Sequence, residues 1–83
     1  MLKKKHGTWL GRHADYAEVK LPRGERWNLH RWADTGETSL IRSKGDGRRL
    51  EEMLGAFQMF EEHFTTTESW DDAAAWAEVI IDA

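Results

Sequence analysis

Cysteine is absent from this chain of 83 residues. Its absence excludes disulfide bonds, thiolate metal sites and cysteine nucleophiles, and it fits the reducing cytoplasm. Long apolar runs are absent as well, because no segment approaches the roughly 20 apolar residues that span a bilayer. The basic start, Lys3-Lys4-Lys5, is not followed by an apolar run, so we expect no secretory signal. A cytoplasmic protein is the resulting expectation.

Catalytic and metal-binding motifs are also missing. The four histidines do not fall into a ligand spacing such as H-E-x-x-H or H-x-H. No serine lies in a nucleophile elbow. The segment 45–49, G-D-G-R-R, is placed as a phosphate-binding turn before a helix would be, but it lacks the pattern G-x-x-x-x-G-K-[ST]. We therefore predict no enzyme activity, no metal and no cofactor.

The abundant residues are aromatic, with five Trp, three Phe and one Tyr. In the single small domain that the length indicates, such residues ordinarily fill the core. The segment R-W-N-L-H-R-W, 26–32, complicates this interpretation. On a strand, Trp27 and Trp32 point to opposite faces because side chains alternate. One tryptophan can then lie in the core, while the other needs a covering element, a partner or exposure to solvent.

Residues 8–43 have the period-two pattern of an antiparallel sheet. Pro22-Arg23-Gly24 and Asp34-Thr35-Gly36 each fit a three-residue hairpin loop that ends in a left-handed glycine. The second loop would place Leu29 opposite Ile41, and the two loops together define one apolar face. The residues expected on that core face are Ala17, Val19, Leu21, Trp27, Leu29 and Ile41.

After residue 47 the apolar spacing becomes helical. Residues 47–64 keep a broad apolar stripe, which Thr65-Thr66-Thr67 interrupts. Ser69 followed by Asp72 resembles a capping box, and this predicts a second helix over 69–82.

The predicted fold is therefore α+β, with a single domain over residues 1–83. Residues 1–7 are expected to be a flexible basic N-terminus, and residues 8–43 a small antiparallel meander of three to four strands. Residues 47–82 are expected to form two C-terminal α-helices.

The face of the predicted sheet opposite the core gathers aromatic and basic side chains, namely Tyr16, Lys20, Arg26, His30, Trp32 and Arg42. Aromatic rings among cations are the composition of a surface that stacks nucleic-acid bases. Against this function, the net charge is −3, and no RNP-like, KH or helix-turn-helix pattern is present. Nucleic-acid binding through this face is therefore an alternative function.

Charge is divided unevenly along the chain. Residues 1–48 hold 11 Lys and Arg and 6 Asp and Glu, a net charge of +5. Residues 49–83 hold one Arg and nine acidic residues, a net charge of −8. Carboxylates gathered on one face could compete with phosphate for a basic surface. The residues expected to form this acidic face are Glu61, Glu62, Glu68, Asp71, Asp72, Glu78 and Asp82.

These patterns favour a small, non-enzymatic protein-binding module. An exposed tryptophan would anchor the partner, and the acidic helices would dock on its basic nucleic-acid-binding surface. Phage and plasmid inhibitors of nucleases often work in this way. The sharpest hypothesis is thus a phage- or mobile-element-type inhibitor of a host defence protein that handles nucleic acid. An antitoxin or an adaptor is the nearest rival, and a homodimer formed through the second helix is a further option.

Overall fold

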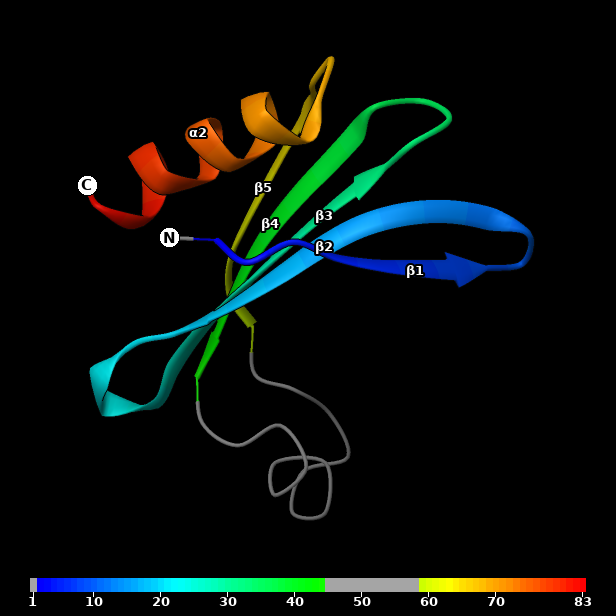
Figure 1. Cartoon of the computed structure of the whole chain (residues 1–83). Helices are drawn as coiled ribbons and strands as arrows, with labels where there is room; N and C mark the ends of the chain where they lie inside the picture. The colour runs from blue at the N-terminus through cyan, green and yellow to red at the C-terminus, as the bar shows by residue number, and fades with distance from the viewer. Residues whose placement is uncertain (1, 45–58) are drawn as a thin grey trace.

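The computed structural model describes residues 2–44 and 59–83, which form one antiparallel sheet with a helix on one side (Figure 1). The elements are β1 (Lys5–Trp9), β2 (Arg12–Lys20), the 3-10 turn η1 (Pro22–Gly24), β3 (Glu25–Trp32), β4 (Glu37–Lys44), β5 (Met59–Thr66) and α2 (Trp70–Ile81). The five strands lie in the order β1-β2-β3-β4-β5, so each pairs with its neighbour in the sequence. No helix of the described residues is long and apolar enough to cross a membrane.

This arrangement contradicts the predicted fold of three to four strands and two C-terminal helices. The described residues form five strands in one sheet and one C-terminal helix. Of the helix expected over 47–64, residues 59–64 belong to β5, and residues 47–58 lie outside the described residues. Strand β5 pairs with β4 from Glu37↔Thr66 to Ser43↔Met59. The backbone hydrogen bonds of β4 and the β-branched threonines at the end of β5 therefore outweigh the local helical spacing.

The N-terminal segment is ordered because β1 pairs with β2 to form a hairpin. Residues 5–7, expected in a flexible terminus, lie in β1, and Leu2 is buried in the core. A two-residue turn joins β1 to β2, in which Leu10 has φ 51° and Gly11 has φ 78°. Positive φ at both turn residues is the type I′ conformation that matches the twist of hairpin strands. Leu10 is an unusual residue there, since a bulky side chain disfavours the left-handed region.

The two predicted hairpin loops differ in outcome. The first has the predicted form, with Gly24 at φ 80° and the expected pairs Val19↔Trp27 and Ala17↔Leu29. The second register is wrong by one residue, because Leu29 pairs with Leu40 and Ile41 pairs with Asn28. The loop consists of the four residues 33–36 and is closed by the hydrogen bond that the Gly36 N–H donates to the carbonyl of Trp32 at 2.8 Å. Leu40 thereby replaces Ile41 on the core face.

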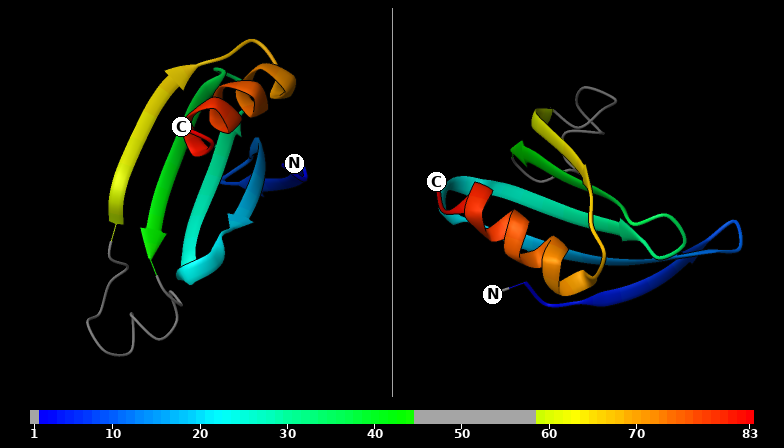
Figure 2. Two further views of the ribbon diagram at one scale, coloured as in Figure 1. Left: turned by 90° about the vertical axis from the view of Figure 1, so that its left-hand side faces the viewer. Right: turned by 90° about the horizontal axis from the view of Figure 1, so that it is seen from above.

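The core lies between the sheet and α2. Its buried side chains come from the N-terminal segment, the three central strands and the helix: Leu2, Ala17, Trp27, Leu29, Leu40, Ala73 and Ala77. The small alanines of α2 allow the helix to pack closely on Leu29 and Leu40, which are fully buried. Figure 2 shows α2 crossing in front of the sheet on this side only. The prediction for α2 is confirmed at its start, where the Ser69 hydroxyl accepts a hydrogen bond from the Asp72 amide at 3.2 Å.

The turn from β5 into α2 is fixed by polar contacts. Arg31 donates from Nε to the Thr67 hydroxyl and from Nη2 to the Thr67 carbonyl, each at 2.9 Å. The buried Thr38 hydroxyl lies 2.8 Å from the hydroxyl of Thr67. Gly36 has φ 74°, and a side chain there would collide with the carbonyl of Thr67. These contacts set the direction in which α2 leaves the sheet.

The observed register gives the first testable prediction. Leu40→Ala removes a fully buried side chain and should lower the free energy of unfolding by about 2–5 kcal/mol. Ile41→Ala, at the next residue but on the opposite face, should cost about 1 kcal/mol or less. Urea unfolding of the two variants measures both values. A larger loss for Ile41→Ala would contradict the register and support the three-residue loop.

Candidate binding site

The sheet has one face without a helix among the described residues, and we call it the open face. Side chains alternate between the two faces along a strand, so the residues on either side of each core residue point to the open face. One row of successive Cα partners crosses all five strands, namely Lys5, Tyr16, His30, Ser39 and Phe64. An antiparallel sheet with one packed face usually carries polar side chains on the other. The open face departs from this pattern because several of its side chains are aromatic.

Four rings from three strands form the aromatic cluster, which consists of Trp9, Tyr16, His30 and Trp32. Trp9 is the central ring, with edge-to-face contacts at centroid distances of 5.8 Å to Tyr16, 5.9 Å to His30 and 6.0 Å to Trp32. Tyr16 and His30 stack at 5.6 Å with an interplanar angle of 17°. The Trp9 ring lies against Gly7, where any side chain would collide with it. The cluster therefore ties the edge strand β1 to β2 and β3, while Trp9 stays 42% exposed.

An ion pair extends the cluster toward the β3–β4 loop. Arg12 donates to both carboxylate oxygens of Asp34, at 2.8 and 3.0 Å, and its guanidinium lies 4.3 Å from the Trp32 ring centroid. The hydrogen bonds from Arg12 lower the pKa of the Asp34 carboxyl. A bidentate pair of this kind holds the guanidinium plane in a fixed orientation against the indole.

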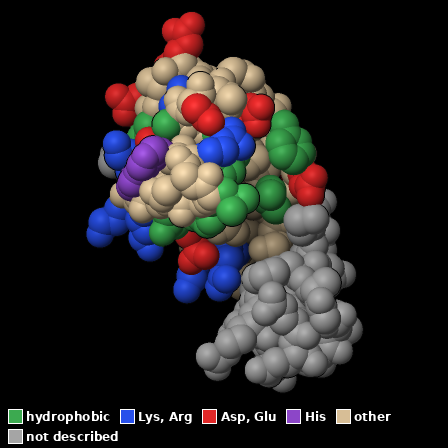
Figure 3. Space-filling view, turned by 90° about the vertical axis from the view of Figure 1, so that its right-hand side faces the viewer, with side chains coloured by type: hydrophobic (Ala, Val, Ile, Leu, Met, Phe, Trp, Pro, Cys, Tyr) green, Lys and Arg blue, Asp and Glu red, His purple; other side chains and the backbone are tan. Residues whose placement is uncertain are grey.

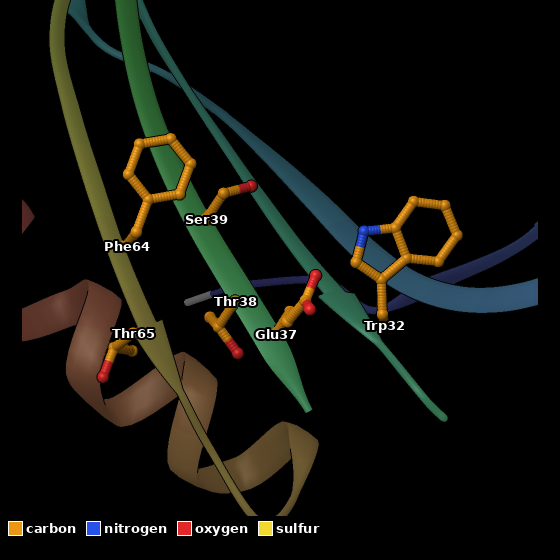
Figure 4. A pocket seen from close by; sticks show the side chains of 6 residues that line it. All are labelled: Trp32, Glu37, Thr38, Ser39, Phe64 and Thr65. Atoms are coloured by element: carbon orange, nitrogen blue, oxygen red, sulfur yellow. The ribbon is translucent and has the colours of Figure 1, made fainter. Parts of the chain in front are cut away.

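On the other side of β3, a hollow opens between Trp32 and Phe64 (Figure 4). Its volume is about 330 Å³, and its lining residues are Trp32, Glu37, Thr38, Ser39, Phe64 and Thr65. Phe64 is 68% exposed, although it is among the most apolar side chains of the chain. Figure 4 shows the indole nitrogen of Trp32 turned toward Ser39 and Phe64, with the Glu37 carboxylate between strand β4 and the indole.

Charges on the open face are largely balanced. The Glu18 carboxylate lies 3.7 Å from Arg26 and 4.0 Å from Lys20. Figure 3, which views the side of the molecule turned away from α2, shows basic, acidic and hydrophobic side chains interspersed. The structure thus brings together Tyr16, Lys20, Arg26, His30 and Trp32 as expected.

Arg42 does not join them. It pairs with Trp27 and not with Asn28, one residue away from the predicted register of β3 and β4, so its side chain lies on the helix side of the sheet. There its guanidinium lies 5.6 Å from the Trp27 ring centroid and within 3.8 Å of Glu25 and 3.3 Å of Glu61.

The seven acidic residues expected on one face are separated. Glu61 and Glu62 are neighbours on a strand and point to opposite faces, and Glu61 contacts both Arg42 and the His63 ring. Glu68 precedes the helix and is exposed. The remaining four, Asp71, Asp72, Glu78 and Asp82, lie along α2 or at its C-cap. By helical spacing, Asp71, Glu78 and Asp82 share the outer side of α2 with the exposed Val79.

A chain of hydrogen bonds occupies the β1–β2 hairpin on the helix side of the sheet. His6 Nδ1 lies 3.1 Å from an Asp15 carboxylate oxygen, and His6 Nε2 lies 3.0 Å from His13 Nδ1. The Thr8 hydroxyl lies 3.3 Å from the same His13 nitrogen. Within residues 2–44 and 59–83, no group of three or more His, Cys, Asp or Glu side chains is arranged to hold a metal ion.

Sequence reasoning missed Trp9, Leu10 and Phe64 as residues of the candidate site. Trp9 lies in the predicted sheet over 8–43 without an assigned partner, and Phe64 lies in the predicted helix over 47–64, which does not form at that position. Both belong to the open face only because β1 and β5 extend the sheet on its two sides. The alternation E-E-H-F-T-T before Thr67 is the one local signal for a strand at β5.

Comparisons with known proteins identify no relative. No protein-family model matches the chain, and no curated protein or solved structure is significantly similar to it. Function must therefore be argued from the geometry of the site, because a fold alone does not specify one.

His30 provides a test of the aromatic cluster. Burial lowers the pKa of its imidazole below the ordinary value of about 6.5, so the unfolded chain binds the proton more readily. The associated stability is present above about pH 6.5 and is lost as the pH falls from there through the folded-state pKa. NMR titration of the His30 ring and urea unfolding at several pH values measure both effects. In His30→Phe this component of the pH dependence should disappear, and a His30 midpoint at or above 6.5 would contradict it.

Proposed function

We propose that this chain is a protein-binding module whose binding surface is the open face of the sheet. The observation that carries the proposal is the pair of large apolar side chains exposed there, Trp9 at 42% and Phe64 at 68%. Neither contributes to the core between the sheet and α2. Trp32 lies between them, since it contacts Trp9 and lines the same hollow as Phe64. Aromatic side chains supply many of the anchoring residues of protein interfaces.

The turn at the edge of this face supports the same proposal. Leu10 is fully exposed and has φ 51°, a conformation that asparagine or glycine adopts more easily. An apolar side chain in a strained and solvated position does not help the fold. A local conflict of this kind is typical of residues retained for function.

The charges favour a protein over a nucleic acid as the partner. Arg12, Arg26 and Lys20 each lie near a carboxylate, and Glu37 and Glu62 lie on the same face. Neutralised cations release few counterions from a phosphate backbone, so this face would gain little of the affinity that drives nucleic-acid binding. The stacked Tyr16 and His30 rings keep single-stranded nucleic acid as the second candidate.

The inhibitor hypothesis changes with this proposal. Docking on a defence protein through one acidic face required seven carboxylates that lie together, whereas Glu61 and Glu62 point apart. Inhibitor, antitoxin and adaptor are all roles that a binding module can serve, and we propose that each would use the open face. The acidic outer side of α2 is the competing surface.

Site-specific photo-crosslinking separates the two surfaces. Benzoylphenylalanine in place of Phe64 reports on the open face, and in place of Val79, which is 73% exposed, it reports on the outer side of α2. We expect a protein from a bacterial lysate to crosslink at position 64 and not at 79, and excess wild-type protein to compete. With the purified partner, Phe64→Ala and Trp9→Ala should each weaken affinity about 30-fold, as for a hot spot of about 2 kcal/mol.

Three results would overturn the proposal. Crosslinking at position 79 alone would assign binding to α2. Affinity for a labelled single-stranded oligonucleotide in the sub-micromolar range at physiological salt would make nucleic acid the ligand. Crosslinking of position 64 only to a second copy of this chain would identify the open face as a homodimer interface.

Replacement of Leu10 should raise the stability of the protein and weaken its binding of a partner. Leu10→Asn should raise the free energy of unfolding by about 1 kcal/mol, because asparagine tolerates positive φ. The same variant should weaken binding of the partner, because the exposed apolar side chain is lost. Urea unfolding and the partner affinity measure the two effects. Unchanged affinity in the stabilised variant would remove Leu10 from the binding surface.

A further inference from the structure

The hollow between Trp32 and Phe64 has features of a site for one specific kind of side chain. Its volume of about 330 Å³ is at the lower limit of small-molecule pockets, so it suits a single side chain of a partner. Trp32 and Phe64 provide apolar walls from β3 and β5, and Ser39 lies on the strand between them (Figure 4). A hydroxyl and an indole N–H therefore accompany two aromatic rings.

Glu37 adds a negative charge at the same place. Within the part of the chain that the structure describes, its carboxylate forms no hydrogen bond or ion pair, although it contributes electrostatically to raising the pKa of Arg12. Arg12 itself is held by the Asp34 carboxylate through two hydrogen bonds. Glu37 thus has its bonding capacity available beside two aromatic side chains.

The same combination of groups already binds guanidinium twice in this protein. Arg12 lies over Trp32 and pairs with Asp34. Arg42 lies over Trp27 and is close to two further carboxylates, those of Glu25 and Glu61. A tryptophan ring and a carboxylate together attract a flat cation through the ring quadrupole and charge-assisted hydrogen bonds. The hollow presents this pair of groups, Trp32 and Glu37, on the β4 side of the indole.

We propose that the hollow binds an arginine side chain of the partner protein, with the guanidinium between Trp32 and Phe64 and hydrogen-bonded to Glu37. This inference rests on the proposed function and names the chemistry of its partner. An acidic side chain would be repelled by Glu37. An apolar side chain would desolvate the carboxylate without replacing its hydrogen bonds, which is unfavourable. Guanidinium is favoured over ammonium because it is planar, stacks on aromatic rings and is more weakly hydrated.

The test uses N-acetylarginine methylamide as the probe and the Trp32 indole N–H resonance as the readout. We expect saturable shifts with a dissociation constant on the order of 1 mM, as for a ligand of this size, and weaker binding at high salt. The citrulline analogue, which keeps the shape without the charge, should bind at least fivefold more weakly. Glu37→Gln and Phe64→Ala should each abolish saturation. Glu62→Gln, which removes a carboxylate from the next row of the open face, should leave it unchanged.

Equal binding of arginine and citrulline derivatives, or full binding by Glu37→Gln, would overturn the inference. The outcome is separable from that of the proposed function. If the partner crosslinks at position 64 and its affinity is the same for Glu37→Gln, the open face binds protein but the hollow does not select a cation. If the arginine derivative binds the hollow and no protein crosslinks at position 64, the cation site stands and the protein-binding proposal fails.

Discussion

One short helix can cover only one face of this sheet, and the rest of the structure follows from that constraint. The 12 residues of α2 span about 18 Å, which suffices to cover the central strands on one side. Leu29 and Leu40 meet Ala73 and Ala77 there and form the buried centre. The described residues supply no second helix for the other side, where the sheet is stabilised within its own surface by ring contacts between strands. Under the proposed function, those rings are also the surface that a partner would contact.

The aromatic cluster therefore has two consequences that cannot be separated. Trp9 fixes the five-residue edge strand β1 through contacts with Tyr16, His30 and Trp32. The same position leaves part of Trp9 in solvent, since nothing lies beyond it on the open face among the described residues. Phe64 differs, because within residues 2–44 and 59–83 it has no ring contact of this kind, and it is more exposed. The fold gives no reason for this exposure, and for that reason Phe64 supports the proposed binding function together with Trp9.

Some of the charged residues form ion pairs inside the molecule. The uneven division of charge along the sequence is therefore only partly available to a binding partner. Arg42 on β4 pairs with Glu61 on β5 and so joins the basic first half of the chain to the acidic second half, whereas Arg12 and Asp34 pair within the first half. Part of the contrast between a basic first half and an acidic second half is thus used inside the molecule. Among the described residues, the carboxylates on the outer side of α2, Asp71, Glu78 and Asp82, form no ion pair. Under our proposal, Glu37 is a single carboxylate placed where a partner's cation would fit.

The sequence by itself determined the alternation of residues 12–32, the first hairpin with its left-handed Gly24, the core position of Trp27 and the capped start of α2. Each of these depends on neighbours within a few residues, where steric limits on φ and the spacing of side chains decide the outcome. Tertiary structure decided the rest. Leu40 and Ile41 are both apolar, so only packing against α2 and the four-residue loop closed by the bond from Gly36 to Trp32 could choose between them. That choice moved Arg42 off the open face. Strand β5 formed because β4 offered it pairing partners from Glu37 to Ser43, with one irregularity between Arg42 and Ser43. A local helical pattern at 59–64 cannot reveal this pairing. The open face, with Trp9 and Phe64 at its two ends, exists only once both edge strands have joined the sheet.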